Sequence, residues 1–198
     1  MGNTDGRAIS SRRVLWLAGL PHYRLRSTVG YYAICYIVVD IAESLGSYVM
    51  VTHTQRIRIV EEIRASNLKG RGLEQRIVEL LSELPTYSSN FIYRLEGDTL
   101  VLDAFTGEAT EHTRIPVGRG VCGTAVAEKA NQLVEDVSKL ENYLCCSLKT
   151  KSEIVVLIRR NGKILGQIDI DSHEICAFDN SDEAFLQELA EILADRWE

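Results

Sequence analysis

The stretch that decides the fold is EIVVLIRRNGKILGQIDID, which spans residues 153–171. Two strand-like segments, 153–160 and 163–171, flank the dipeptide Asn161-Gly162. Asn-Gly favours a two-residue type I′ turn, whose twist matches that of the strands it joins. The stretch therefore predicts an antiparallel β-hairpin in which Arg160 lies opposite Lys163.

Helix and turn signals around this hairpin predict the rest of the domain. Apolar residues recur at helical spacing after Leu73 and stop at Pro85. Ser181 is the expected N-cap of a C-terminal helix. The expected elements are, in chain order, a helix over 73–84, strands over 90–95 and 99–105, a helix over 121–129, a strand over 132–137, a loop over 138–151, the hairpin, and the C-terminal helix. The fold class is therefore α+β, with a central, mainly antiparallel sheet flanked by N- and C-terminal helices.

Length and composition indicate a globular domain with an extension. The chain has 198 residues, of which 45% are hydrophobic and 25% are charged, and the polar, glycine-containing segment 67–72 is the clearest boundary. We expect an N-terminal extension of unknown role over 1–70 and one domain over 71–198. A net charge of -6 argues against nucleic acid as a partner, because nucleic-acid-binding domains usually carry a basic surplus.

Cysteine usage and the N-terminal segment bear on location. The five cysteines show no C-x-x-C pattern and no secreted disulfide framework, so we expect a cytoplasmic protein with thiols available for chemistry and no metal site. The apolar segment 31–51 contains Asp40 and Glu43, and charges at the centre of a membrane span are costly. We therefore expect no stable membrane insertion.

Acidic side chains gather at the end of the hairpin. Asp169 and Asp171 are two residues apart, so in a strand they project from the same face, and mutual repulsion raises the pKa of one of them. The alternative is that both lie at a frayed, solvated strand end. A two-residue turn places Glu153 opposite Ile170, on the other face. Glu153 joins the aspartates only if it precedes the regular strand or a β-bulge re-aims it.

Two groups of cysteines are candidates for thiol chemistry. Cys122 follows a Gly-x-Gly turn at an expected helix start, where the helix dipole favours a thiolate. Cys145 and Cys146 lie in the long loop, whereas Cys35 and Cys176 are interpreted as small buried hydrophobes. His112 is either a partner for the thiols or a polar loop residue.

The chain resembles the GAF-domain family of free methionine-R-sulfoxide reductases over roughly residues 73–197. The resemblance rests on RIPVGRGVCGTA at 114–125, SEIV at 152–155 and DIDS at 169–172, in matching order and spacing. Cys146, which follows Cys122 by 24 residues, falls on the cysteine that ends the family's loop. The resemblance implies a GAF-like fold, a homodimer, and a small pocket for free methionine sulfoxide.

The same resemblance implies roles for individual residues. Cys146 attacks the sulfoxide sulfur, a second cysteine closes a disulfide, and thioredoxin reopens it, with no cofactor. Glu153, Asp169 and Asp171 hold the substrate's ammonium group and protonate the departing oxygen, and Tyr93 lines the pocket. Cys122 is the expected resolving thiol, although the reverse assignment of the two cysteines stays open.

Two departures from the family pattern keep a second function in view. His112 stands where the family commonly has another cysteine, so recycling must use Cys122 or Cys145. Ser89 stands at the position of a pocket tryptophan. The rival hypothesis is a non-catalytic GAF module that binds a small ligand or senses redox state.

Overall fold

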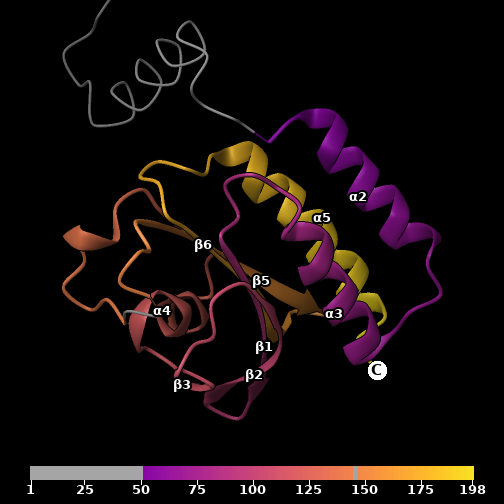
Figure 1. Ribbon diagram of the computed structural model, residues 1–198. Helices are drawn as coiled ribbons and strands as arrows, with labels where there is room; N and C mark the ends of the chain where they lie inside the picture. Colours follow the sequence, from indigo (N-terminus) through magenta and orange to yellow (C-terminus); the bar gives the residue numbers. More distant parts are fainter. Residues whose placement is uncertain (1–50, 145–146) are drawn as a thin grey trace, which may run out of the picture. The chain divides into compact units, whose positions relative to one another are not determined.

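The computed structural model describes residues 51–144 and 147–198, which belong to a compact unit that spans Ser47–Glu198. Its chain order is helix, helix, hairpin, small strand, helix, small strand, hairpin, helix (Figure 1). The elements are α2 (His53–Ala65), α3 (Gly70–Leu81), β1 (Ser89–Glu96), β2 (Thr99–Thr106), β3 (Arg114–Pro116), α4 (Gly120–Glu128), β4 (Gln132–Val134), the 3-10 helix η1 (Val137–Lys139), β5 (Ser152–Arg160), β6 (Lys163–Ser172) and α5 (Asn180–Asp195).

The strands form one sheet in the order β3-β2-β1-β6-β5-β4, and every pairing in it is antiparallel. Asn161 and Gly162 join β5 to β6 with φ angles of 52° and 75°. Positive φ at both central residues is what a type I′ turn requires. The predicted hairpin, the pairing of Arg160 with Lys163 and the α+β fold class are confirmed.

Helices cover both faces of the sheet, and each face has its own core (Figure 1). On one face, α2, α3 and α5 pack against alternate residues of the central strands, such as Ile92, Ile154 and Ile168. On the other face, α4 packs against the intervening residues, such as Phe91, Tyr93 and Val155. The strict alternation of strand side chains therefore assigns each residue of β1, β5 and β6 to one core.

Helix ends differ from the expectation at two places. Asp179, not Ser181, is the N-cap of α5, since its carboxylate accepts hydrogen bonds from the backbone of Ser181 and Asp182, and the Asp182 side chain returns the bond. The helix therefore starts with a complete capping box. Helix α3 begins at Gly70, inside the polar segment taken as the boundary.

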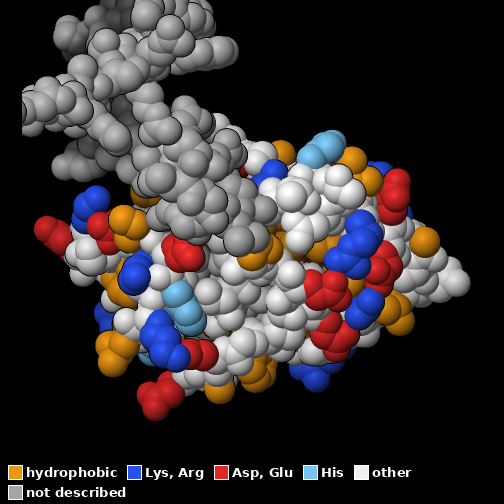
Figure 2. All heavy atoms as spheres, turned by 45° about the horizontal axis from the view of Figure 1, so that its top comes forward, with side chains coloured by type: hydrophobic (Ala, Val, Ile, Leu, Met, Phe, Trp, Pro, Cys, Tyr) orange, Lys and Arg blue, Asp and Glu red, His pale blue; other side chains and the backbone are white. Residues whose placement is uncertain are grey.

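Helix α2 lies within the range 1–70 that was interpreted as an extension, and it packs on the domain core through Ile59, Val60 and Ile63. Its outer face forms ion pairs, including Arg58 with Glu83 and Arg64 with Glu188. On the face shown in Figure 2, basic side chains stand beside acidic ones. Among the described residues, no helix combines the length and the apolar character needed to cross a bilayer; the apolar segment at 31–39 lies outside them.

A buried ion network ties the helical face to the sheet. Arg94 on β1 contacts the carboxylates of Glu74 and Asp103, which are 0% and 2% exposed, and its guanidinium lies 4.2 Å from the centre of the Trp197 ring. Burial, and then the hydrogen bond with Asp103, raises the pKa of Glu74 to about 7. The guanidinium thus compensates two acids that water does not reach.

Replacing Arg94 with methionine is expected to lower the free energy of unfolding by about 3 kcal/mol at pH 7.5, because it leaves two buried acids without their cation. The loss should shrink at pH 5, since Glu74 is then protonated and needs no partner. Urea unfolding at the two pH values measures it. Arg71→Met is the matched control, because exposed Arg71 also contacts Asp103 and its removal should cost less than about 1 kcal/mol. An equal loss at both pH values would contradict the argument.

Candidate active site

A β-bulge in the central hairpin brings the predicted acids together. The pairing of β5 with β6 shifts between Ile158 and Arg159, so that Ile158 lies opposite Gly166 and Glu153 lies opposite Asp171. The simple two-residue register, which placed Glu153 opposite Ile170, is therefore wrong beyond the bulge. The alternative in which a bulge re-aims Glu153 is correct. Glu153, Asp169 and Asp171 all project toward α4.

Helix α4 places the thiol of Cys122 over this acidic face. Cys122 is the third residue of α4, as expected for a cysteine at a helix start. A Cβ atom on Gly123 would lie 2.5 Å from the carbonyl oxygen of Pro116, so only glycine allows the helix to approach β3 this closely. The Cys122 Sγ atom lies 3.1 Å from Asp169 Oδ2 and 4.0 Å from Glu153 Oε1.

Burial controls the ionisation of the three acids, which are 5% exposed or less. Burial, followed by the charges of Asp169 and Asp171, raises the pKa of Glu153 well above its ordinary value. Burial raises the pKa of Asp169 to about 7, against the lowering effect of the hydrogen bond from Cys122. Burial and then the charge of Asp169 raise the pKa of Asp171 well above its ordinary value. The cluster therefore holds protons near neutral pH and can donate them.

Several carboxylate oxygens of this cluster remain available to a ligand. Both oxygens of Asp171 and the Oδ1 atom of Asp169 are buried and have no hydrogen-bond partner among the described residues. Buried polar atoms of native proteins are normally paired. Oxygens in this state suit a ligand that brings N–H or O–H donors, such as the ammonium group of an amino acid.

Aromatic residues of β1 and β2 line the same face. Tyr93 is fully buried, and its hydroxyl donates a 3.1 Å hydrogen bond to the carbonyl oxygen of His112. Phe91 lies opposite Asp169 and stacks on Phe105, with ring centres 6.4 Å apart. The sequence analysis did not include Phe91, although its place two residues before Tyr93 puts it on the same strand face.

The cysteines divide into three cases. Cys122 is buried and is a thiol, whereas Cys145 and Cys146 lie outside the described residues. Cys176 is disulfide-bonded and only half-buried, so its interpretation as a small buried hydrophobe is wrong. No spacing pattern in the sequence marks Cys176 for this chemistry.

Comparison with known proteins identifies the family. The family model described as GAF domain matches residues 71–198, which include the sheet, α4, α5 and all the site residues described above. The chain belongs to the GAF-domain family. The match begins at the boundary expected from the sequence.

The relatives of this GAF domain carry one name repeatedly. It is 44% identical over 99 residues to the free methionine-R-sulfoxide reductase of Saccharomyces cerevisiae, which covers 50% of this chain and 54% of the relative. It is 45% identical over 97 residues to that of Escherichia coli, which covers 49% and 58%. The chain thus spans little more than half the length of these curated relatives. The resemblance inferred from the sequence motifs is confirmed.

A solved structure extends the comparison across the fold. The free methionine-R-sulfoxide reductase of Neisseria meningitidis, solved in complex with its substrate, is 30% identical, with a TM-score of 0.67. The alignment covers 76% of this chain and 93% of that one. The likeness therefore includes nearly all of a substrate-binding relative.

The cavity beside the site groups of the GAF domain is small. It measures about 10 Å³ and is lined by Cys122, Glu153, Arg119 and Leu144, among others. This volume holds about one water molecule, so an amino-acid ligand requires the walls to move apart. A larger cavity of about 260 Å³ borders the same Gly120–Val121 segment on the side of Leu140–Asn142.

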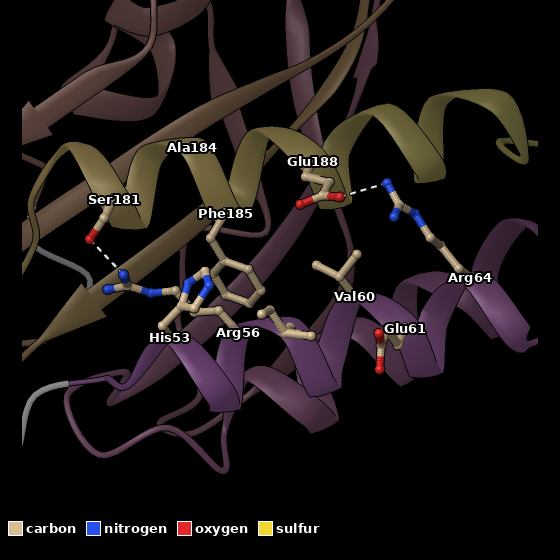
Figure 3. Close-up of a pocket in the computed structure, with 10 residues that line it drawn as sticks. His53, Arg56, Val60, Glu61, Arg64, Ser181, Ala184, Phe185 and Glu188 are labelled. Atoms are coloured by element: carbon tan, nitrogen blue, oxygen red, sulfur yellow. Dashed lines mark hydrogen bonds and ion pairs between the residues drawn. The ribbon is translucent and has the colours of Figure 1, made fainter.

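The largest described groove of the GAF domain lies away from these groups, between α2 and α5 (Figure 3). It measures about 350 Å³, and Val60 and Phe185 form its floor between two polar contacts, Arg56 with Ser181 and Arg64 with Glu188. None of the predicted site residues lines it. The chemistry is therefore placed at α4 and the sheet, not in the larger groove.

The site could also hold a cation. One sulfur and two carboxylate oxygens, from Cys122, Glu153 and Asp169, lie within 4.8 Å of one another. A metal ion would displace the protons that burial keeps on these acids, so metal affinity would rise with pH. An ammonium group fits the same oxygens without binding the thiol.

The buried acids predict how stability depends on pH. The pKa of Asp169 is raised in the folded state, so its contribution to stability is full below its unfolded pKa and is lost as pH rises through about 7. Asp169→Asn removes this dependence while keeping an oxygen that accepts the Cys122 hydrogen bond. We expect the variant to gain about 2 kcal/mol relative to the parent between pH 5 and pH 8. Thermal unfolding at both pH values measures the gain, and a difference that is flat with pH would contradict it.

Proposed function

We propose that this GAF domain reduces free L-methionine (R)-S-oxide to methionine. The observation that carries the proposal is the arrangement of one thiol and three proton-holding acids on a single buried face of the sheet. Relatives named for this activity support it. The arrangement suits a substrate that has an ammonium group and an oxygen that must leave with a proton.

Cys146 performs the attack in this proposal, although it lies outside the described residues. Its thiolate attacks the sulfoxide sulfur, the sulfur–oxygen bond breaks, and the oxygen passes to Cys146. Methionine leaves reduced by two electrons, and Cys146 becomes a sulfenic acid, oxidised by two. Since the oxygen must be protonated as the bond breaks, an acid that keeps its proton near neutral pH is required.

The acids divide the remaining work. Asp171, with two available oxygens, binds the substrate ammonium, while Glu153, with its raised pKa, donates the proton. Tyr93 and Phe91 contact the apolar part of the substrate. Cys122 donates to Asp169 and keeps that carboxyl oriented toward the cavity. A second thiol and thioredoxin complete the cycle, and the working form is a cytoplasmic homodimer.

The direct test uses purified protein with dithiothreitol and racemic methionine sulfoxide. The R isomer should be consumed and the S isomer should remain, as followed by chiral chromatography of the amino acids. The same assay on methionine sulfoxide within a peptide should show no reduction, because a blocked amine cannot pair with the acids. Consumption of neither isomer would refute the proposal.

A non-catalytic binding module is the second candidate function. Two observations favour it. Ser89 stands where the family has a pocket tryptophan, and its hydroxyl accepts a hydrogen bond from the Glu108 backbone; in addition, the cavity beside Cys122 holds only about one water. In this case methionine sulfoxide raises the melting temperature of the protein while no methionine forms. Turnover of the R isomer would exclude the candidate.

A further inference from the structure

We propose that Cys176 is the resolving thiol of this domain, which attacks the sulfenic acid of Cys146 and closes a Cys146–Cys176 disulfide. The inference rests on the proposed function, and it replaces the expectation that Cys122 resolves. It answers the question raised by His112, which stands where the family commonly has another cysteine.

The first argument is the state of Cys176 itself. It is disulfide-bonded, so a second sulfur lies within bonding distance, about 2 Å. It is half-buried and has a φ angle of 53°, in the left-handed region that side chains other than glycine rarely adopt. Backbone strain of this kind persists where the surrounding structure holds it, and it is frequent at functional sites.

The second argument is the position of the turn that carries Cys176. The backbone N–H of Cys176 donates to the carbonyl oxygen of Glu135, 2.9 Å away, at the start of the long loop. At the other end of that loop, the Ser152 hydroxyl donates to the Glu174 carbonyl oxygen at 2.6 Å. The turn is therefore bonded to both ends of the loop that contains Cys146, and Ser152 directly precedes Glu153.

The last part of the loop is also tied to this turn. The Lys151 N–H donates to the Ser172 carbonyl oxygen at 2.8 Å, and the Glu174 N–H donates to the Ser172 hydroxyl at 3.2 Å. Ser147 accepts a hydrogen bond from the Thr150 N–H at 3.2 Å, which keeps it beside this segment. The Cα atom of the preceding residue, Cys146, is about 3.8 Å from that of Ser147. Both cysteines therefore belong to chain segments that meet at Ser172.

Cys122 is less suited to resolve. Its thiol donates to Asp169 and lies next to Glu153, so the thiolate needed for attack would stand beside buried acids. Cys176 is outside that cluster. In the step proposed here, the Cys176 thiolate attacks the sulfenic sulfur, the S–S bond forms, the S–O bond breaks, and the oxygen leaves as water. A dithiol reductant then reopens the disulfide.

The experiment follows one turnover of the full chain without reductant. Reduced protein is mixed with excess methionine (R)-S-oxide, and released methionine, lost thiols and disulfide-linked peptides are measured together. We expect the parent to lose two thiols per methionine and to yield the Cys146–Cys176 peptide pair. Cys176→Ser should lose one thiol per methionine and accumulate a sulfenic acid that dimedone traps at Cys146. Cys122→Ser and Cys145→Ser are the comparison variants, and they should still form the pair.

A second arm separates this inference from the proposed function. One equivalent of hydrogen peroxide oxidises the reduced protein without methionine sulfoxide, and it should yield the same peptide pair. If peroxide forms the pair but the sulfoxide does not, the proposed activity is refuted and the pairing stands. If Cys146 is joined to Cys122 or Cys145 in either arm, or if Cys176→Ser still loses two thiols, the assignment of Cys176 is overturned.

Discussion

Replacing Cys146 with serine is expected to lower the release of methionine from methionine (R)-S-oxide by at least about 10³-fold. A serine hydroxyl is a poor nucleophile at neutral pH and cannot take up the sulfoxide oxygen, so the covalent step has no substitute. The loss should appear in kcat, while binding of methionine sulfoxide, measured as a shift in melting temperature, remains. Initial rates with dithiothreitol give the first quantity and thermal unfolding gives the second.

Two neighbouring variants make this prediction specific. Cys35→Ser also removes one thiol, but from a position with no role in the chemistry, and its activity should equal that of the parent. Cys145→Ser tests which member of the adjacent pair attacks. Full loss in Cys145→Ser with activity retained in Cys146→Ser would show that the attacking cysteine is misassigned by one residue.

Replacing Glu153 with glutamine is expected to lower kcat/KM by about 10²- to 10⁴-fold, the usual contribution of a positioned acid. Glutamine keeps the shape and the acceptor oxygen but carries no acidic proton. Burial beside Asp169 and Asp171 raises the pKa of Glu153, which is why this group holds the proton that the departing oxygen needs. The measurement is the pH profile of kcat/KM for the parent and the variant.

The direction of the pH dependence follows from the raised pKa values. Because the protonated cluster is the active form, the activity of the parent should be full at acidic pH and should fall as pH rises through about 7, where Asp169 ionises. Glu153→Gln should retain little of this dependence. The matched control is Glu174→Gln, an exposed acid in the turn after β6, which should match the parent at every pH. A parent whose activity rises above pH 7 would contradict the assignment of the acids as proton donors.

The structure explains why the acid cluster was only partly predictable. Asp169 and Asp171 share a strand face by simple alternation, and the sequence shows this directly. Glu153 joins them only because β6 carries one extra residue, Leu165, between the partners of Arg159 and Ile158. Gly166 is the local signal for this, since a Cβ atom there would lie 2.1 Å from the carbonyl oxygen of Tyr93. A glycine inside a strand often marks a bulge or a close approach, but it does not tell which.

The sequence by itself determined the hairpin, the α+β class and the family, because turn chemistry, periodicity and a contiguous motif are local properties. It also determined which residue types are available for thiol and proton chemistry. The tertiary structure alone decided that Glu153 faces Asp171, that Cys122 donates to Asp169, and that Cys176 is disulfide-bonded. These facts depend on register beyond a bulge and on segments far apart in the chain. Such contacts are set by packing on both faces of the sheet, which no short stretch of sequence encodes.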